Sequence, residues 1–155
     1  MAFHRLKRKQ LLKTDIDTAW NFFSVPDNLN RMTPPNMSMQ VLYKSGGNKV
    51  YAGQIITYII KPILGIPLNW MTEIVHVKEK EYFVDEQRFG PYALWHHSHF
   101  FKEVEGGIEM TDIVNYKMPF GFIGEMAHIL FVKKQLTEIF DYRNQQMERI
   151  FGDTK

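Results

Sequence analysis

Hydrophobic positions follow the pattern of a strand and then of a short helix at the start of the chain. Residues 3–12 are predicted to form a first strand. Over 15–24 the apolar residues recur at the spacing of one helix face, which predicts a short helix that buries Ile16, Ala19, Trp20 and Phe23. Thr14 or Asp15 can cap this helix, and Pro26 ends it.

The middle of the chain is predicted to be a sheet. One more helical turn is expected over 27–32, before Pro34-Pro35 forces an extended exit. From Met37 to Met118 the chain consists of strand-like runs, which predict an antiparallel meander of six strands. The turn signals between the runs are Ser45-Gly46-Gly47-Asn48, Lys61-Pro62 to Pro67, Lys78-Glu79-Lys80, Gly90-Pro91 and Glu105-Gly106-Gly107.

After Pro119 the apolar residues recur at helical spacing, which predicts one helix roughly 45 Å long. Its expected apolar face is marked by Ile123, Met126, Ala127, Leu130, Leu136, Ile139, Phe140, Met147 and Ile150. A long helix that closes a run of strands is typical of an α+β domain in which the helix crosses one sheet face. The chain of 155 residues is expected to form a single domain over 1–155.

The stretch from Trp95 to Phe101 carries three of the six histidines. On a strand, Trp95, His97, His99 and Phe101 share one face, because successive side chains alternate. Two imidazoles between two aromatic rings are typical of the wall of a ligand pocket that is mostly apolar with a few polar groups.

Turn lengths decide which side chains meet these histidines. A tight turn at Glu105-Gly106 sets His99 opposite Asp112. A three-residue loop over 90–92 sets Asp85 opposite His97, whereas a two-residue loop moves Asp85 to the other face. With the longer loop, two histidines and two aspartates converge on one patch. The residues expected to contact a ligand are Tyr58, Trp70, Thr72, Asp85, Gln87, Trp95, His97, His99, Asp112, Val114, Tyr116, Met126 and Leu130.

Several segments together resemble those of a known superfamily: 20–29, 33–37, 65–70, 83–87, 90–92, 95–101 and 112–120. They are similar to the polyketide cyclase/dehydrase-like branch of the START/Bet v 1-like (SRPBCC) superfamily, whose members mostly have no assigned function. The resemblance covers the whole chain. It implies a helix-grip fold, with a seven-stranded antiparallel sheet wrapped around the long C-terminal helix and two short helices after the first strand. It also implies a hydrophobic cavity between sheet and helix, but no particular reaction.

Composition bears on location and partners. The chain has no cysteine, which excludes disulfides and thiolate chemistry and fits a reducing cytoplasm. No signal peptide or transmembrane segment is expected, since no apolar run approaches the ~18 residues of a span. A net charge of +2 is too small to indicate nucleic acid. The apolar segment 59–67 is either a tucked turn or a tip that contacts a membrane transiently. The glycines of 121–124 either offer N–H groups to an anion or only turn the chain.

The favoured interpretation is a binding protein for a small hydrophobic or amphipathic molecule, with the polar patch as a hydrogen-bonded cluster or an anchor for the ligand's head group. The alternative is a cyclase, dehydratase or hydrolase that uses His97 or His99 as acid or base, although no nucleophile or phosphate motif accompanies them. A third interpretation is an interaction module whose cavity is filled by its own aromatic side chains. His97 and His99 are close enough to share a metal ion, but no third histidine has suitable spacing, so no metal or other cofactor is expected. The sequence leaves the oligomeric state open.

Overall fold

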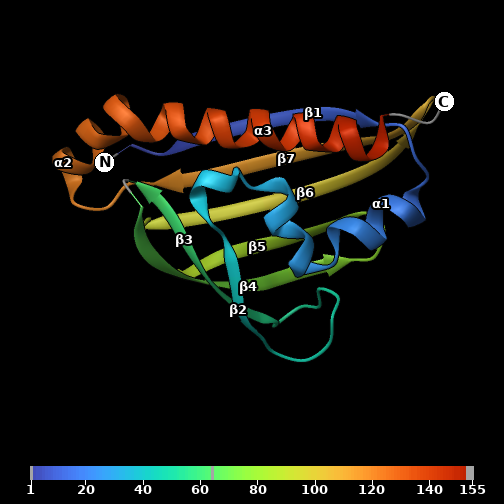
Figure 1. The fold of residues 1–155 in the computed structure, drawn as a ribbon, viewed down its shortest axis with the longest axis horizontal. Helices are drawn as coiled ribbons and strands as arrows, with labels where there is room; N and C mark the ends of the chain where they lie inside the picture. Colours follow the sequence, from blue (N-terminus) through green and yellow to red (C-terminus); the bar gives the residue numbers. More distant parts are fainter. Residues whose placement is uncertain (1, 64, 153–155) are drawn as a thin grey trace.

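The computed structural model describes residues 2–63 and 65–152. Seven antiparallel strands form one sheet in the order β1-β7-β6-β5-β4-β3-β2, as predicted (Figure 1). Their bounds are β1 His4–Leu12, β2 Gln40–Lys44, β3 Ile55–Ile63, β4 Ile66–Lys78, β5 Tyr82–Phe89, β6 Leu94–Val104 and β7 Gly107–Lys117. Leu64, which belongs to the predicted apolar segment 59–67, lies outside the described residues, as do 1 and 153–155.

The β3–β4 connection differs from the prediction. The segment 61–67 was expected to be a loop, but β3 runs to Ile63 and β4 resumes at Ile66. Gly65 has a φ of 71°, a value that residues with a side chain rarely adopt. Residues 61–63 and 66–67 therefore belong to strands, with Ile63 paired to Ile66 and a register irregularity between Ile60 and Ile63.

The helices also follow the predicted order. Helix α1 (Ile16–Phe23) begins at Asp15, whose carboxylate accepts a 2.8 Å hydrogen bond from the Thr18 backbone N–H. Two short 3₁₀ helices follow it, η1 (Pro26–Met32) and η2 (Pro35–Met37). The C-terminal helix consists of α2 (Gly121–Ala127), the π-helical segment η3 (His128–Val132) and α3 (Lys133–Phe151).

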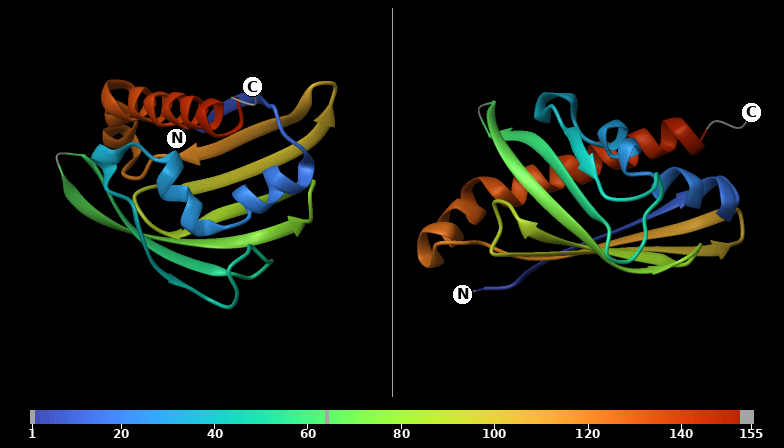
Figure 2. Two further views of the ribbon diagram at one scale, coloured as in Figure 1. Left: turned by 45° about the vertical axis from the view of Figure 1, so that its right-hand side comes forward. Right: turned by 90° about the horizontal axis from the view of Figure 1, so that it is seen from below.

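The sheet curves around α3, which lies along its concave side, while α1, η1 and η2 cover other parts of that side (Figures 1 and 2). Helix α1 packs on β6 and β7, and α3 packs on β1 and η1. The fold is thus the α+β helix-grip arrangement that the resemblance implied. In the part of the chain that is described, no helix is long and apolar enough to cross a bilayer.

The predicted apolar face of the C-terminal helix is wrong for Ile123, Met126 and Leu130, which are exposed. The buried positions of the first half are instead Gly124 and His128, and the buried row continues through Val132, Leu136, Phe140, Arg143, Met147 and Phe151. A π-helical turn holds an extra residue relative to an α-helical turn, so it changes the phase of the buried face. An apolar helix spacing that is extended from α3 back across η3 therefore assigns the wrong face of α2 to the core.

Gly124 allows the start of the C-terminal helix to approach the end of β7. A Cβ atom at this position would lie 1.8 Å from the carbonyl oxygen of Pro119. Gly121, with a φ of 56°, turns the chain into the helix. These glycines serve the geometry of the chain, and a helix as short as α2 provides no anion site by itself.

Candidate functional site

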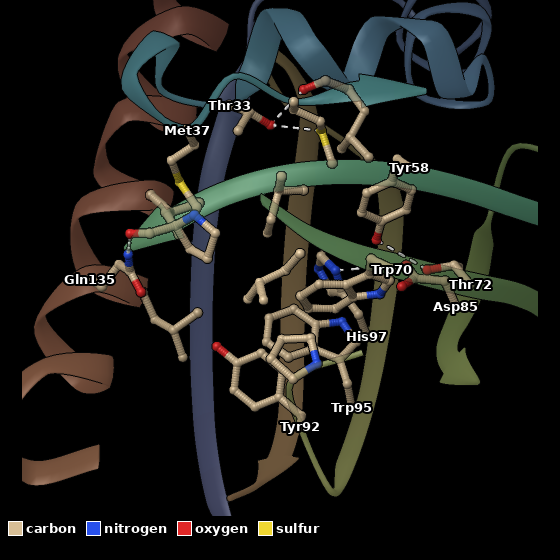
Figure 3. Close-up of a pocket in the computed structure, with 18 of the residues that line it drawn as sticks. Thr33, Met37, Tyr58, Trp70, Thr72, Asp85, Tyr92, Trp95, His97 and Gln135 are labelled. Carbon is tan, nitrogen blue, oxygen red and sulfur yellow. Dashed lines mark hydrogen bonds and ion pairs between the residues drawn. The ribbon is translucent and has the colours of Figure 1, made fainter. Parts of the chain in front are cut away.

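A cavity of about 420 Å³ lies between the sheet, α3 and the short helices (Figure 3). Most of its wall is apolar. The apolar lining comes from Phe23, Met32 and Met37 of the short helices, Ile56, Ile60, Trp70 and Ile74 of β3 and β4, and Leu136, Ile139 and Phe140 of α3. Its volume is within the range of roughly 300–1,000 Å³ that is usual for small-molecule sites.

Most of the polar lining groups gather on one part of this wall, where β3 to β6 run side by side, while Thr33, Gln135 and Arg143 line other parts of it. The hydroxyl of Tyr58 lies 3.1 Å from the hydroxyl of Thr72, and both residues are buried. Burial, with Asp85 nearby, raises the pKa of Tyr58, so its hydroxyl keeps its proton. Asp85, His97 and His99 lie beside this pair and also line the cavity.

The two histidines and two aspartates form one buried network. Nε2 of His97 lies 2.9 Å from Oδ1 of Asp112, and Nε2 of His99 lies 2.7 Å from Oδ2 of Asp85. The other nitrogens are also near a carboxylate, with His99 Nδ1 3.2 Å from Asp112 and His97 Nδ1 3.7 Å from Asp85. The imidazole rings lie 3.7 Å apart between centroids. Each histidine is therefore within reach of both aspartates.

Arg143 of α3 completes this network from the helix that packs on the sheet. Its Nη2 lies 3.2 Å from Oδ1 of Asp112, and the side chain is only 7% exposed. The guanidinium also lies 5.5 Å from the ring centre of Phe23 and 5.9 Å from that of Phe140. A helix residue thus ties α3 to the centre of the sheet through a buried ion pair.

The pKa shifts define the charges of the network. Burial opposes ionisation of Asp112, but Arg143 and the two histidines outweigh it and hold the pKa of Asp112 well below its usual value. Burial also opposes charge on His99, but its contacts with Asp112 and Asp85 outweigh burial and raise its pKa. Burial and the charge of His99 lower the pKa of His97. With His99 protonated and His97 neutral, two carboxylates are balanced by two cations.

The register predicted for β6 and β7 is confirmed, and between β5 and β6 the structure has the register of the longer of the two loops considered. His99 pairs with Asp112 across β6 and β7, and Asp85 pairs with His97 across β5 and β6. Seven of the expected ligand contacts line the cavity: Tyr58, Trp70, Thr72, Asp85, Trp95, His97 and His99. Asp112 does not line the cavity; it is hydrogen-bonded to His97 and lies 3.2 Å from Nδ1 of His99.

The other five expected contacts have different surroundings. Gln87 turns to the 90–92 loop, where its amide accepts from the Tyr92 N–H at 3.1 Å and donates to the Tyr92 carbonyl at 2.7 Å. Val114 is fully buried in the core, and the hydroxyl of Tyr116 lies 2.9 Å from Nε2 of His128. Met126 and Leu130 are on the outer face of the helix, 43% and 58% exposed, because the π segment rotates that face away from the sheet.

Arg143 was missed at the sequence level, although the chain contains a signal for it. The buried row of α3 includes Leu136, Phe140, Arg143 and Met147, at the spacing of one helix face. A charge on an otherwise apolar helix face requires a buried partner, because an unpaired buried charge is very costly. That reasoning would have directed attention to the two aspartates of the sheet.

Two groups of described residues have ligand atoms within 4.8 Å of one another, as a metal site requires: Asp85, His97 and His99, and His4, Glu125 and His128. In the first group, His99 is already hydrogen-bonded to Asp85. In the second, the His4 and His128 rings are stacked with centroids 3.6 Å apart, which does not aim both rings at one ion. In both groups each histidine makes a hydrogen bond through Nε2, while Nδ1 of His99 and Nδ1 of His128 are buried without a hydrogen-bond partner.

Comparison with solved structures supports the same class of fold. Ginseng major latex-like protein 151 from Panax ginseng is 14% identical, with a TM-score of 0.69 over 97% of this chain and 99% of that chain. A protein from Chromobacterium violaceum is 10% identical, with a TM-score of 0.73 over 97% and 99%. Ara h 8.0201 is 12% identical, with a TM-score of 0.65 over 94% and 98%. No protein-family model and no curated protein matches the chain. The chain therefore shares the helix-grip fold of these proteins.

Proposed function

We propose that residues 1–155 are one ligand-binding domain that holds a small hydrophobic or amphipathic molecule in the cavity between sheet and α3. The observation that carries this proposal is the distribution of polarity, since a mostly apolar cavity of about 420 Å³ has most of its polar groups on the part of the wall formed by β3 to β6. An apolar ligand body would gain from leaving water, and a single polar head would find hydrogen-bonding partners.

The network indicates which head group is suitable. His97, His99 and the Tyr58 hydroxyl can exchange hydrogen bonds with a ligand, while the carboxylates beside them are already balanced by hydrogen bonds to the histidines and by the ion pair with Arg143. A fully charged head group would disturb this balance at a buried position, which is costly. A neutral head that both donates and accepts, such as a hydroxyl or a carbonyl-bearing group, is favoured.

A cavity-filling substitution tests the proposal. Leu136 lines the cavity, whereas Leu42 of edge strand β2 is 54% exposed. We expect Leu136→Trp to weaken binding of the neutral fluorescent apolar probe Nile red by about tenfold, while Leu42→Trp leaves it unchanged. Native mass spectrometry of protein from its own host would show whether a ligand is retained. The proposal would be overturned if both variants bound the probe with equal affinity and the native mass spectrum showed only the mass of the protein without a ligand.

A second function is supported by one further observation, the placement of two carboxylate-bound histidines on the cavity wall. A histidine oriented by a carboxylate is suited to general acid or base catalysis of a cyclisation, dehydration or hydrolysis. The double variant His97→Gln and His99→Gln distinguishes the two functions. A binding protein keeps most of its affinity for the retained ligand, whereas an enzyme loses turnover of that ligand while still binding it.

A further inference from the structure

The helical segment between β7 and α3 exposes an unusual amount of apolar surface. Seven large apolar side chains within twelve residues are between 43% and 84% exposed, and we call them the α2 surface: Phe120, Phe122, Ile123, Met126, Ile129, Leu130 and Phe131. Exposed apolar residues are normally scattered, and a contiguous group of this kind marks an interaction site. We propose that the α2 surface docks onto an anionic lipid bilayer.

Helix geometry brings these side chains together. Phe122, Met126 and Ile129 are separated by four and three residues, so they are neighbours on one face. The opposite positions, Gly124 and His128, are buried against the rest of the protein. The segment is thus an amphipathic helix with its apolar face turned outward, the arrangement of helices that lie in a membrane interface.

The charges around the α2 surface are suited to anionic lipid. Lys133 and Lys134 follow it directly and are exposed, and Lys117 precedes it. Within 113–134 the only acidic residue is Glu125, whose Oε2 lies 2.9 Å from Nε2 of His4. Basic residues beside an inserted apolar face are attracted to the negative lipid surface. A second copy of this chain would bring a patch of the same positive sign, so it fits less well.

The position of the α2 surface relative to the cavity supports the same partner. Phe120 and Ile123 line the cavity and are also 84% and 74% exposed, so they form part of its rim. The segment projects at one end of the molecule, beyond the strands (Figures 1 and 2). The side-chain amide of Gln135 donates to the carbonyl of Pro62, which joins this end of the helix to the β3–β4 hairpin. Docking here would place the cavity rim against lipid.

Vesicle sedimentation tests the proposal with the full chain. We expect wild-type protein to bind phosphatidylcholine vesicles that contain phosphatidylserine, and to bind less to phosphatidylcholine alone. The double variant Phe122→Ser and Leu130→Ser should lower this affinity by about tenfold or more. The matched control, Leu42→Ser with Tyr43→Ser, removes side chains that are 54% and 58% exposed on β2 and should bind as wild type does. Lys133→Gln with Lys134→Gln should lower affinity for the anionic vesicles by about tenfold.

Three outcomes would overturn the proposal. Wild-type protein fails to sediment with anionic vesicles, or the β2 control loses as much binding as the α2 variant. In the third, sedimentation velocity shows a dimer that the Phe122→Ser and Leu130→Ser changes dissociate, which assigns the surface to a second copy. Circular dichroism checks that each variant is folded. The cavity-filled variant Leu136→Trp should still bind vesicles, so failure of ligand binding and failure of docking are distinguishable.

Discussion

His97 and Asp112 share a hydrogen bond of 2.9 Å between Nε2 and Oδ1, although His99, not His97, lies directly opposite Asp112 in the β6–β7 pair. His99 bonds in the same way to Asp85, which lies opposite His97. Side chains of this length reach diagonal neighbours on a sheet face as well as direct ones. The two histidines therefore compete for the same two carboxylates, and their protonation is coupled.

The first prediction concerns the protonation of His99. Removing the charge of Asp112 by Asp112→Asn should lower the pKa of His99, since a carboxylate next to a buried imidazole favours its protonated form. An NMR titration of the histidines in both proteins measures this change. Glu109→Gln is the control, because Glu109 is on the same strand but pairs with Lys9 at the surface. An unchanged His99 titration in Asp112→Asn would contradict the coupling.

The second prediction concerns the ion pair between α3 and the sheet. Arg143→Met leaves Asp112 buried beside histidines alone, and we expect a loss of about 3–5 kcal/mol in the free energy of unfolding. Arg149→Met, an exposed position on the same helix, should have little effect. The double variant Arg143→Met with Asp112→Asn should lose less free energy of unfolding than the sum of the losses in the two single variants. Denaturant unfolding of all four variants measures this, and strict additivity would argue against the pair.

The third prediction concerns the pH dependence of stability. The pKa of His99 is raised above 6.5 on folding, so its stabilising contribution is complete below pH 6.5 and is lost as the pH rises through the folded value. The pKa of His97 is lowered, so its contribution is complete above pH 6.5 and is lost as the pH falls. The loss in the free energy of unfolding that His99→Gln causes, relative to wild type, should therefore be smallest at alkaline pH. His97→Gln should show the opposite trend in urea unfolding measured across this range, and parallel trends would contradict the charge assignment.

The fourth prediction concerns the close approach at Gly124. Gly124→Ala places a Cβ atom 1.8 Å from the Pro119 carbonyl oxygen, so the helix start must shift. We expect a loss of about 1–3 kcal/mol in the free energy of unfolding. Gly47→Ala is the matched control, since nothing lies within 4 Å of the added atom. It should be neutral or slightly stabilising. Equal thermal denaturation midpoints for the two variants would show that the contact is not close.

Much of the fold and half of the site could be predicted from local features. Asp15 caps α1 through a bond that closes within three residues. The two-residue turn at Glu105-Gly106 determines the whole β6–β7 register, so His99 and Asp112 could be paired without knowledge of the rest. Alternation along β6 then placed His97 and His99 on the cavity side. These inferences succeeded because each depends on neighbours a few residues apart or on a single turn length.

The remaining features depend on contacts between distant parts of the chain. The sequence alone determined the order of elements, the β6–β7 register and the aromatic, histidine-bearing face, since short turns and side-chain alternation are local properties. Only the tertiary structure decided that Arg143 of α3 would reach Asp112 of the sheet and that Met126 and Leu130 would face outward. A helix can present any face to a sheet, and here the packing at Gly124 and one π-helical segment select that face. Spacing along the helix does not reveal this choice, because it is made by the surface against which the helix packs.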